Sequence, residues 1–518
     1  MLLKKTLALM GMRKLVFIAS LSFLVFGIYL VLEKIFSIYF LIFPCIILFF
    51  VLTDIAQSKH SVRRNYPLLG RFRYLFESVR PEFRQYFFEG ELDGKPFNRR
   101  QRSIVYQRAK NEKQTISFGM QDDPNRIGYE WAAHSIYPKS PDVEQFRVTI
   151  GNVQCRQPYN GSIYNISAMS YGALSKTAIT SLNKGAKKGN FAHNTGEGGI
   201  SDYHLQGGDL IWQIGTGYFG CRNEDGTFSD ELFAERANYN QVKMIELKLS
   251  QGAKPGHGGL LPKEKNTAEI AKIRSIKPHT TVHSPSGHTA FSNAVELMYF
   301  INKLRTLSNG KPVGFKICIG RKEEFTNILE AIIETGILPD FITIDGAEGG
   351  TGAAPLEFID HIGMALADAL AFVSASLKEY GIRDQIKLMA SGKIISAFDI
   401  AKAMALGADA CYSARGMMFA LGCIQALQCD SGKCPVGIAT QDKLLYKGID
   451  ITDKSERVNN FHKNTIKALS EFIGACGYTS PKEISPEVFF RKTEQNQNKS
   501  FAEIYFENKN RKSDLINF

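Results

Sequence analysis

The stretch 341–355, FITIDGAEGGTGAAP, decides the fold of this chain. Its first four residues are apolar or β-branched, which is typical of a buried strand, and they run directly into a glycine-rich loop. Glycine lets a backbone approach a bound molecule closely. In closed barrels of parallel strands, active sites lie where the strands end. The stretch therefore predicts a barrel strand that leads into part of a ligand site.

Similar apolar runs alternate with helical segments from residue 162 onward, which is the pattern of a parallel α/β fold. Glycine-rich or polar loops follow these runs directly. The predicted strands are 163–167, 190–193, 243–247, 280–283, 313–317, 341–344, 386–389 and 410–413. Together they predict a (β/α)8 TIM barrel, with a long insertion after the second strand.

The loops after the last three strands predict a phosphate site. In barrels that bind a phosphorylated cofactor, the loops after strands seven and eight commonly hold the phosphate through backbone N–H groups. Glycine-rich turns also occur simply as tight loops, but several at successive strand ends favour a bound cofactor. The predicted residues are Ser391, Gly392, Lys393, Ala414, Arg415 and Gly416, with Gly349, Gly350, Thr351 and Gly352 from the sixth loop.

The segment 215–220, GTGYFG, matches the dinucleotide fingerprint by letter only. It continues into the turn-rich CRNEDGTF instead of opening a helix inside a βαβ unit. No other Rossmann or Walker pattern is evident in the sequence. We therefore do not expect electrons to enter the chain directly from a pyridine nucleotide.

Cys423, Cys429 and Cys434 fall within the stretch 422–441, GCIQALQCDSGKCPVGIATQ. Closely spaced thiolates on a loop suit iron–sulfur chemistry, and three ligands favour a cluster that lacks one iron or keeps one position open. Structural zinc, a disulfide or chance spacing are the alternatives. Zinc normally uses four ligands in paired short spacings. The other six of the nine cysteines are scattered, which indicates a reducing cytosol instead of a disulfide framework.

Two uncharged apolar runs, 15–32 and 35–52, lie near the N-terminus, and each is long enough to span a bilayer. A signal peptide or a hairpin in a soluble core are the alternatives, but the first run is too long for the former and a second run follows at once. By the positive-inside rule, the flanking basic residues place both ends in the cytoplasm. These residues are Lys4, Lys5, Arg13, Lys14, Lys59, Arg63, Arg64, Arg71 and Arg73. The pattern predicts a multi-pass protein of the inner (cytoplasmic) membrane with a cytoplasmic catalytic domain.

The chain is predicted to have four parts. They are a transmembrane hairpin (1–56), a basic connector or cap (57–150), the barrel with its cysteine loop (151–445) and a helical C-terminal tail (446–518). Within the connector, 73–88 predicts a helix broken at Pro81. The net charge of +12 would permit a nucleic-acid partner. Because no nucleic-acid-binding motif accompanies them, we expect anionic membrane lipid, and no nucleic acid, beside Arg99, Arg100, Arg102, Arg108 and Lys110.

From about residue 163 to 441 the chain resembles the FMN-binding synthase domain of glutamate synthase, in a short membrane-attached form. The matching motifs are AMSYG (168–172), NTGEGG (194–199), ELKLSQGAKPGHGG (246–259), DGAEGGTGAAP (345–355) and CPVGIATQ (434–441). The resemblance implies FMN in the barrel mouth, a [3Fe–4S] cluster on the three cysteines, and formation of L-glutamate from 2-oxoglutarate and ammonia through 2-iminoglutarate, an EC 1.4 activity. Further FMN-binding residues implied by it are Ala168, Met169, Ser170, Asn194, Thr195 and Lys316.

The resemblance also suggests roles for charged residues. Lys248, Lys254 and Arg274 stand where 2-oxoglutarate contacts are expected, although Arg274 would otherwise be a solvated helix charge. Lys316 points inward on the fifth strand, where it would stabilise negative charge on reduced flavin, since a buried lysine is otherwise costly. Glu197 is expected to orient ammonia or transfer a proton, or else to cap the following turn.

The chain also departs from the family pattern. The long enzymes begin with a glutaminase domain, so we expect free ammonia or a separate glutaminase here, and ferredoxin or a nicotinamide-oxidising subunit as electron donor. Leu260 replaces a glutamine ligand, His257 replaces a glutamate, and 286–290 (SGHTA) replaces PPPHHD. Losing a polar ligand changes which substrate a pocket prefers. Another small 2-oxo acid or amine therefore stays open as the substrate.

Two other classes of function stay open as well. One is a membrane redox module without turnover. The other is a metal hydrolase built on His193, His257, His283 and His288, which lie near predicted strand ends but share no short ligand spacing.

Overall fold

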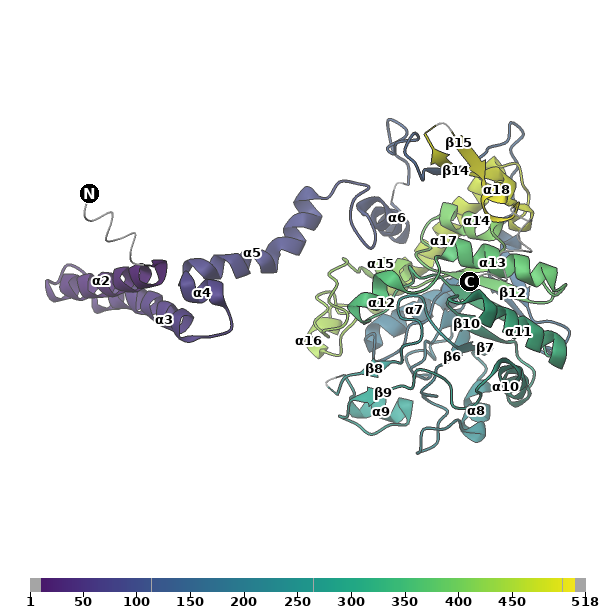
Figure 1. The fold of residues 1–518 in the computed structure, drawn as a ribbon, viewed down its shortest axis with the longest axis horizontal. Helices are drawn as coiled ribbons and strands as arrows, with labels where there is room; N and C mark the ends of the chain where they lie inside the picture. The colour runs from purple at the N-terminus through teal and green to yellow at the C-terminus, as the bar shows by residue number, and fades with distance from the viewer. Residues whose placement is uncertain (1–10, 113, 264, 496, 508–518) are drawn as a thin grey trace. The chain divides into compact units, whose positions relative to one another are not determined.

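The computed structural model describes residues 11–507 except 113, 264 and 496. The chain divides into two compact units, residues 1–99 and 100–518 (Figure 1). The boundary between the units falls inside the predicted connector (57–150), and the predicted division into four parts stays a prediction.

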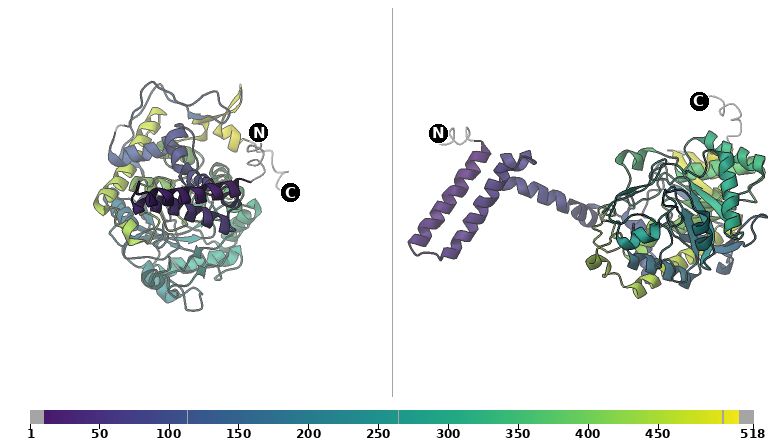
Figure 2. Two further views of the ribbon diagram at one scale, coloured as in Figure 1. Left: turned by 90° about the vertical axis from the view of Figure 1, so that its left-hand side faces the viewer. Right: turned by 90° about the horizontal axis from the view of Figure 1, so that it is seen from below.

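In the first unit, α2 (Met12–Leu32) and α3 (Ile42–Ala56) lie side by side, joined through the short helix η1 (Ile38–Leu41) (Figure 2). Both predicted apolar runs are therefore helices, and each is long and apolar enough to cross a membrane by length and composition. Most of their large apolar side chains are exposed. Lys4 and Lys5 lie outside the described residues.

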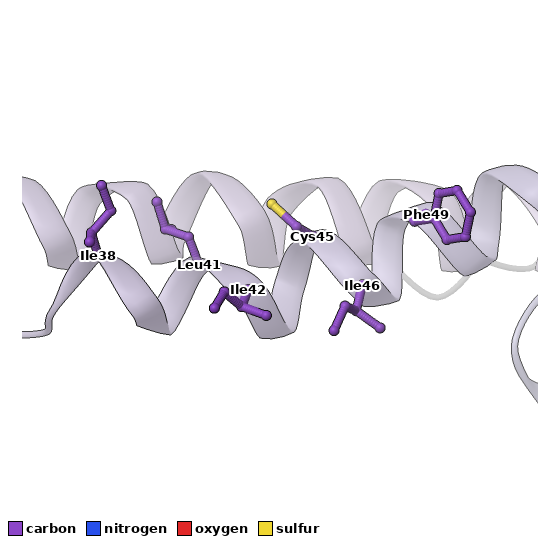
Figure 3. A pocket seen from close by; sticks show the side chains of 6 residues that line it. All are labelled: Ile38, Leu41, Ile42, Cys45, Ile46 and Phe49. Atoms are coloured by element: carbon purple, nitrogen blue, oxygen red, sulfur yellow. The ribbon is translucent and has the colours of Figure 1, made fainter.

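A shallow apolar groove of about 460 Å³ runs along η1 and α3 (Figure 3). Its lining carries no charge. The lining residues are Ile38, Leu41, Ile42, Cys45, Ile46 and Phe49.

Asp54 at the end of α3 fixes the two helices that follow, α4 (Ser61–Asn65) and α5 (Leu69–Phe83). Its side chain is fully buried, and its two carboxylate oxygens accept from Arg63 Nη2 at 2.6 Å and Arg71 Nε at 2.8 Å. A buried carboxylate between two guanidinium groups holds its partners firmly, because separating them would leave a charge unpaired. The start of α5 is thereby attached to the end of the hairpin.

The predicted helix break at Pro81 is wrong. The helix α5 continues through Pro81 to Phe83, and η2 (Arg84–Phe88) extends it as a turn of π-helix. Proline removes one backbone donor from a helix, and a wider π turn is one of the distortions that absorb such a defect.

The second unit is built on a closed barrel of parallel strands in the order β10-β11-β12-β13-β4-β5-β6-β7. Helices surround it (Figures 1 and 2). The predicted TIM barrel is therefore confirmed. Its strands are β4 (Tyr164–Ile166), β5 (His193–Asn194), β6 (Leu210–Ile214), β7 (Val242–Lys248), β10 (Val313–Ile317), β11 (Phe341–Asp345), β12 (Lys387–Ser391) and β13 (Ala410–Ser413).

One predicted barrel strand is wrong and one barrel strand lies in the predicted insertion. The strand β6, LIWQI, is fully buried and pairs between β5 and β7. The predicted strand 280–283 contributes only β9 (Val282–His283), which pairs antiparallel with β8 (Leu260–Leu261) outside the barrel. His283 is exposed, which a barrel strand does not allow. Relative to the prediction the barrel gains one strand and loses one. The loops after the sixth, seventh and eighth strands therefore keep their predicted places.

Between most successive barrel strands the chain forms one or two helices, and further helices precede and follow the barrel. They are α6 (Arg99–Lys110), α7 (Lys176–Gly189), α8 (Asp230–Ala237), α9 (Ala268–Arg274), α10 (Ala294–Leu307), α11 (Lys322–Thr335), α12 (Leu356–His361), α13 (Leu366–Glu379), α14 (Ala397–Ala405), α15 (Arg415–Leu421), α16 (Lys443–Tyr446), α17 (Ile451–Ala475) and α18 (Phe501–Tyr505).

The C-terminal tail opens with the long helix α17, as predicted, and α17 packs along α7. It then adds two strands, β14 (Phe489–Glu494) and β15 (Gln497–Ser500), to β1 (Glu130–Ala132). A small hairpin, β2 (Arg147–Ile150) and β3 (Tyr159–Ser162), precedes the barrel.

Two of the basic side chains expected to meet lipid face protein instead. Arg102 is buried, and Arg108 donates to Thr465 Oγ1 on α17 at 3.2 Å. Both lie on α6, whose apolar positions Val105 and Ala109 are also buried. These arginines therefore stabilise the packing of α6 within the second unit.

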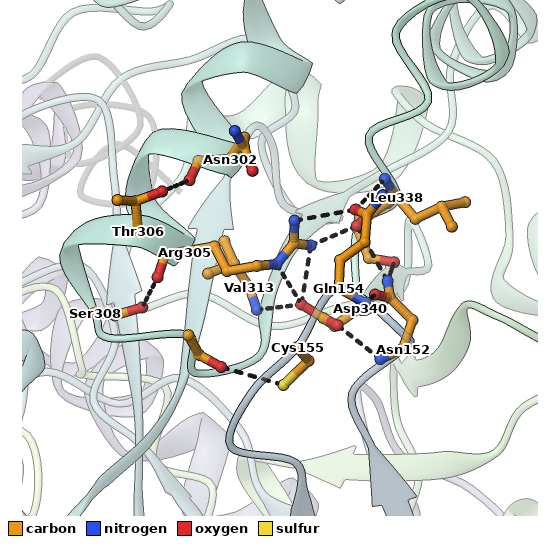
Figure 4. A network of polar contacts seen from close by, with 12 residues as sticks. Asn152, Gln154, Cys155, Asn302, Arg305, Thr306, Ser308, Val313, Leu338 and Asp340 are labelled. Carbon is orange, nitrogen blue, oxygen red and sulfur yellow. Dashed lines mark hydrogen bonds and ion pairs between the residues drawn. The ribbon is translucent and has the colours of Figure 1, made fainter.

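The end of the barrel where the strands begin is held by Asp340, which precedes β11 (Figure 4). Asp340 Oδ2 accepts from Arg305 Nη2 at 3.1 Å and from the Val313 backbone at 2.8 Å. Its Oδ1 accepts from the Asn152 backbone at 2.8 Å. Because the side chains of Asp340 and Arg305 are 0% and 5% exposed, neither charge has water as an alternative partner.

We expect Asp340→Asn to lower the free energy of unfolding by about 3–5 kcal/mol, because it leaves a buried guanidinium unpaired. Denaturant unfolding followed by the fluorescence of the buried Trp212 measures the change. Glu324→Gln is the control, since it removes an exposed pair with Arg321 and should change the value by less than about 0.5 kcal/mol. Equal effects of the two variants would contradict this account.

Candidate functional site

The charged centre of the barrel mouth is an ion pair between Lys316 and Asp345 on the neighbouring strands β10 and β11. Lys316 Nζ lies 3.1 Å from Asp345 Oδ2, and both side chains are buried. Burial acts to lower the pKa of Lys316, but Asp345 and then Glu246 outweigh it and the pKa is raised. Lys316 therefore keeps its charge although it is buried.

Glu197, in the loop after β5, is the carboxylate around which the predicted substrate-binding cations gather. Lys248 Nζ donates to its Oε1 at 2.8 Å. Burial acts to raise the pKa of this carboxylate, but Lys248, Lys254 and Arg274 lower it below its usual value. Glu197 in turn contributes to the raised pKa of Lys316. All four predicted cations therefore lie within electrostatic reach of one carboxylate.

Arg274 is buried at the end of α9, so the alternative of a solvated helix charge is wrong. Its Nη2 donates to the Tyr171 carbonyl at 3.1 Å, and its guanidinium lies 5.1 Å from the centroid of the Phe219 ring. Burial lowers the pKa of Arg274 to about 10. Burial and then the charge of Lys248 also lower the pKa of Lys254. These cations are crowded together, which favours an anionic ligand.

The segment 215–220 follows β6 and opens no helix, since the next helix is α8. Its first glycine serves the site in another way. A Cβ at Gly215 would lie 2.3 Å from Glu197 Oε2, so only glycine lets the carboxylate lie there.

A buried polar network beneath these charges was absent from the sequence predictions. Glu246 on β7 accepts from Asn194 Nδ2 at 2.7 Å and Gln213 Nε2 at 2.6 Å on one oxygen. Its other oxygen accepts from Thr343 Oγ1 at 2.6 Å. The available signal was the spacing of Glu246 and Lys248, because residues two apart in a strand point to the same side. The network ties β5, β6, β7 and β11 together.

The predicted phosphate loops do meet. Arg415 Nη2, after β13, donates to the Glu348 carbonyl after β11 at 2.7 Å. A Cβ at Gly350 would lie 2.7 Å from Arg415 Nε, whereas one at Gly352 would meet nothing within 4 Å. Burial lowers the pKa of Arg415 to about 10. The glycine loop thus packs against a cation on one side and is open at its tip.

The loop after β12 completes this group. Gly392 has a φ of +141°, which L side chains rarely adopt, and Lys393 beside it is exposed. The backbone N–H of Gly346 donates to the Ser391 carbonyl at 2.8 Å. A Cβ at Gly349 would lie 2.9 Å from the carboxylate of Asp345. The other predicted members lie in the same loops: Thr351 donates to Ala353, Ala414 is half-buried, and Gly416 packs on Ser413.

The polar groups of the loops after β4 and β5 form hydrogen bonds mainly with other groups of the protein. The side chain of Asn194 belongs to the Glu246 network. Thr195 Oγ1 donates to the Gly196 carbonyl at 3.0 Å, and Met169 is buried. Ala168 and Ser170, in the loop after β4, are half-buried.

The three cysteines of the loop between α15 and α16 form one electrostatic group. The pKa of Cys423 is raised to about 12. Burial is the largest cause, and the nearby Cys429 and Cys434 add to it. Burial and then Cys434 also raise the pKa of Cys429. Cys434 is buried. Buried thiols that lie near one another are groups that a metal centre binds as thiolates.

Donors hold the cysteine loop from several sides. The backbone N–H of Gln425 donates to Cys423 Sγ at 3.4 Å. The Tyr106 hydroxyl donates to the Cys423 carbonyl at 2.6 Å, and Lys265 Nζ donates to the Cys429 carbonyl at 3.1 Å. The loop is therefore placed by α6 on one side and by the segment after β8 on the other.

The histidines of the alternative hydrolase site do not converge. His193 is buried and neither of its ring nitrogens has a partner, while His257 and His283 are exposed. Within the described part of the chain, no three His, Cys, Asp or Glu side chains are close enough to hold one metal ion. A single-metal hydrolase has no support in this arrangement.

Residues 139–479 match the family described as the conserved region in glutamate synthase. The chain belongs to the glutamate synthase family. It is 39% identical to the glutamate synthase large subunit-like protein YerD of Bacillus subtilis, over 85% of this chain and 91% of that protein. It is 37% identical to the archaeal glutamate synthase (NADPH) of Methanocaldococcus jannaschii, over 61% of this chain and 59% of that protein.

Among solved structures, the chain resembles the recombinant flavin-binding domain of baker's yeast flavocytochrome b2. The TM-score is 0.44 at 12% identity, over 82% of this chain and 86% of that domain. A similarity of this degree carries no argument about function. Membership of the glutamate synthase family itself supports an oxidoreductase.

His288, in the segment that departs from the glutamate synthase pattern, is built into the wall of the mouth. Its Nε2 lies 2.8 Å from the Lys248 carbonyl and its Nδ1 lies 3.1 Å from the Tyr218 hydroxyl. Because a carbonyl only accepts, Nε2 carries the proton and Nδ1 accepts from Tyr218. Burial lowers the pKa of His288 to about 4. A neutral His288 therefore attaches this segment to the end of β7.

This pKa predicts a loss of stability in acid. The folded value of about 4 lies below the ordinary value of 6.5, so the unfolded state binds one more proton between them and stability falls as pH drops through this window. The slope is about 1.4 kcal/mol per pH unit for one proton. We expect His288→Gln to reduce the slope of unfolding free energy against pH by that amount. The exposed His361→Gln should leave the slope unchanged, and an unchanged slope in His288→Gln would contradict the assignment.

Proposed function

We propose that this chain is a membrane-attached enzyme of the glutamate synthase type, which uses FMN to form L-glutamate from 2-oxoglutarate and ammonia through 2-iminoglutarate. The observation that carries the proposal is the gathering of Lys248, Lys254, Arg274 and Lys316 around Glu197 at the barrel mouth. The family match gives these charges their context.

The charges at the mouth suit a dianion. Lys316 pairs with Asp345, and three cations, Lys248, Lys254 and Arg274, face the single carboxylate of Glu197, while Glu246 is bonded within the polar network. The substrate 2-oxoglutarate carries two carboxylates, which such cations would bind and orient. A monocarboxylic 2-oxo acid would leave part of this charge without a partner.

Glu197 is ionised, since its pKa is lowered. An ionised carboxylate accepts hydrogen bonds, so it would orient ammonia and take up a proton as the imine forms. Lys316 keeps a fixed positive charge nearby, which stabilises negative charge that develops during reduction. Glu197 would therefore transfer the proton, and Lys316 would stabilise the charge.

The loops after β11, β12 and β13 fit FMN. The open tip at Gly352, the positive φ of Gly392 and the cation of Arg415 offer backbone and charge to a phosphate. Arg415 and the glycine loop would hold the phosphate, and Lys316 would lie toward the flavin ring. Bound there in its reduced form, FMN would supply hydride to the imine carbon.

The cysteine loop fits a cluster better than a single ion. A single structural ion normally takes four ligands, whereas a cluster that lacks one iron takes three thiolates, each through a different iron. Cys423, Cys429 and Cys434 would hold a [3Fe–4S] cluster. Such a centre carries single electrons, so an external donor, ferredoxin or a nicotinamide-oxidising subunit, would reduce the enzyme there.

The apolar helices α2 and α3 support attachment to the inner (cytoplasmic) membrane as a multi-pass hairpin, with the barrel in the cytoplasm. Ammonia would come free from solution or from a separate glutaminase.

The proposal is tested by anaerobic reduction of the purified, FMN-loaded protein. We expect rapid reoxidation only when 2-oxoglutarate and ammonium are both present, with L-glutamate as the product. Faster reoxidation with another 2-oxo acid would favour the alternative substrate that the changes at His257 and Leu260 leave open. No reoxidation with any 2-oxo acid would instead indicate a redox module without turnover.

Lys254→Met should raise the 2-oxoglutarate concentration for half-maximal reoxidation by about 10- to 100-fold, because one charged hydrogen bond is lost. FMN content should not change. Lys272→Met, exposed on α9, is the control and should behave as the wild type. Loss of FMN in Lys254→Met would place this lysine on the cofactor instead.

Cys429→Ser should remove the iron and its visible absorbance while FMN stays bound, because the two groups use different loops. Cys476→Ser, outside the cysteine loop, should keep both. Iron content and absorption spectra after oxygen-free purification measure this. Simultaneous loss of iron and FMN would show that the cluster is needed for the fold of the mouth.

A further inference from the structure

The helix α5 and its extension η2 carry an exposed apolar stripe. Leu69, Phe72, Phe76, Phe83 and Phe87 recur at the spacing that places residues on one face of a helix. All five are exposed, from 52% for Phe72 to 74% for Phe87. The rings of Phe83 and Phe87 lie 5.5 Å apart, so the stripe continues across the π turn. Water is a poor partner for an aromatic surface of this extent.

Arginines run along one edge of this stripe. Arg73, Arg80 and Arg84 are exposed and follow one another at helical spacing, beside the apolar face. Two of them have acidic neighbours, Glu77 at 4.0 Å from Arg80 and Glu89 at 3.6 Å from Arg84. Both pairs are largely exposed at the arginine, so the guanidinium groups stay available to a second anion.

The attachment of α5 to the apolar hairpin indicates what covers the stripe. Asp54, in the last turn of α3, binds both Arg63 and Arg71, and Arg71 lies in the first turn of α5. The stripe therefore begins at the end of an apolar hairpin suited to a bilayer. From there α5 turns away from the direction of α3 (Figure 2).

We propose that α5 and η2 lie in the headgroup layer of an anionic bilayer, with the apolar stripe toward the acyl chains and the arginines at lipid phosphates. Helices with an aromatic apolar face and a basic edge bind membranes in this way. Aromatic side chains favour this layer because it is half apolar and half wet. The inference rests on the proposed membrane attachment through α2 and α3.

The test uses the full chain in vesicles that contain phosphatidylglycerol, with and without brominated acyl chains, which quench tryptophan on contact. Phe76→Trp places a probe in the stripe, and Ser78→Trp places a matched probe away from it on the same helix. The wild type gives the background from Trp131 and Trp212. We expect brominated lipid to remove most of the added emission of Phe76→Trp and little of that of Ser78→Trp.

Other outcomes would overturn the inference. Equal quenching of both probes would mean that α5 is surrounded by lipid, and absence of quenching in both would mean that it lies outside the bilayer. A blue-shifted Phe76→Trp that brominated lipid does not quench would assign the stripe to a protein partner. Alkaline carbonate extraction distinguishes failure of this inference from failure of the proposed membrane attachment. Release of the protein from the vesicles by carbonate would refute the membrane attachment itself.

The basic edge has its own test. Arg73→Gln combined with Arg84→Gln should weaken the quenching of Phe76→Trp in phosphatidylglycerol vesicles, but not in vesicles of phosphatidylcholine alone. Arg64→Gln, on α4, is the control. Quenching that does not depend on phosphatidylglycerol or on these arginines would show that headgroup charge plays no part.

Discussion

The pair of Lys316 and Asp345 is the constraint on which the barrel mouth depends. A lysine in a buried strand keeps its charge only when a carboxylate lies beside it, since an unpaired buried charge is far too costly. The parallel pairing of β10 with β11 sets Lys316 opposite Thr343, which brings Asp345 to the next inward position. Strand register therefore decides the charge of the site before any ligand arrives.

The layer beneath this pair explains why the charge stays in place. Glu246 is held by amide and hydroxyl donors, Asn194, Gln213 and Thr343, and it has no ion pair among the residues that the structure describes. Its negative charge adds to that of Asp345 in raising the pKa of Lys316. The barrel interior thus supports the mouth electrostatically as well as by packing, and a fully bonded network of this kind resists rearrangement.

The sequence predicts the barrel and most of its strands, because apolar runs and glycine loops report local structure directly, whereas the cations of the mouth are expected from the resemblance to glutamate synthase. It misplaces 280–283 as a barrel strand and passes over β6, because a short apolar run looks the same whether it pairs inside or outside a closed sheet. Partner choice is harder still. Asp345 and Glu246 belong to motifs in the sequence, but their roles depend on pairing across strands that no local pattern records. The burial of Arg102 and Arg274 is likewise a tertiary fact.

The departures from the family motif at Leu260 and 286–290 lie in one connected part of the structure. The backbone of Leu260 pairs with His283 in the β8–β9 hairpin, and the Ser284 backbone N–H donates to the Gly259 carbonyl at 2.9 Å. The segment that contains His288 leaves this hairpin and is attached at the end of β7 through the Lys248 carbonyl. A wall built this way changes as a unit, because altering either strand displaces the other. Arg274 lies on α9, within the segment that joins β8 to β9, so a change in this wall also reaches one of the cations around Glu197.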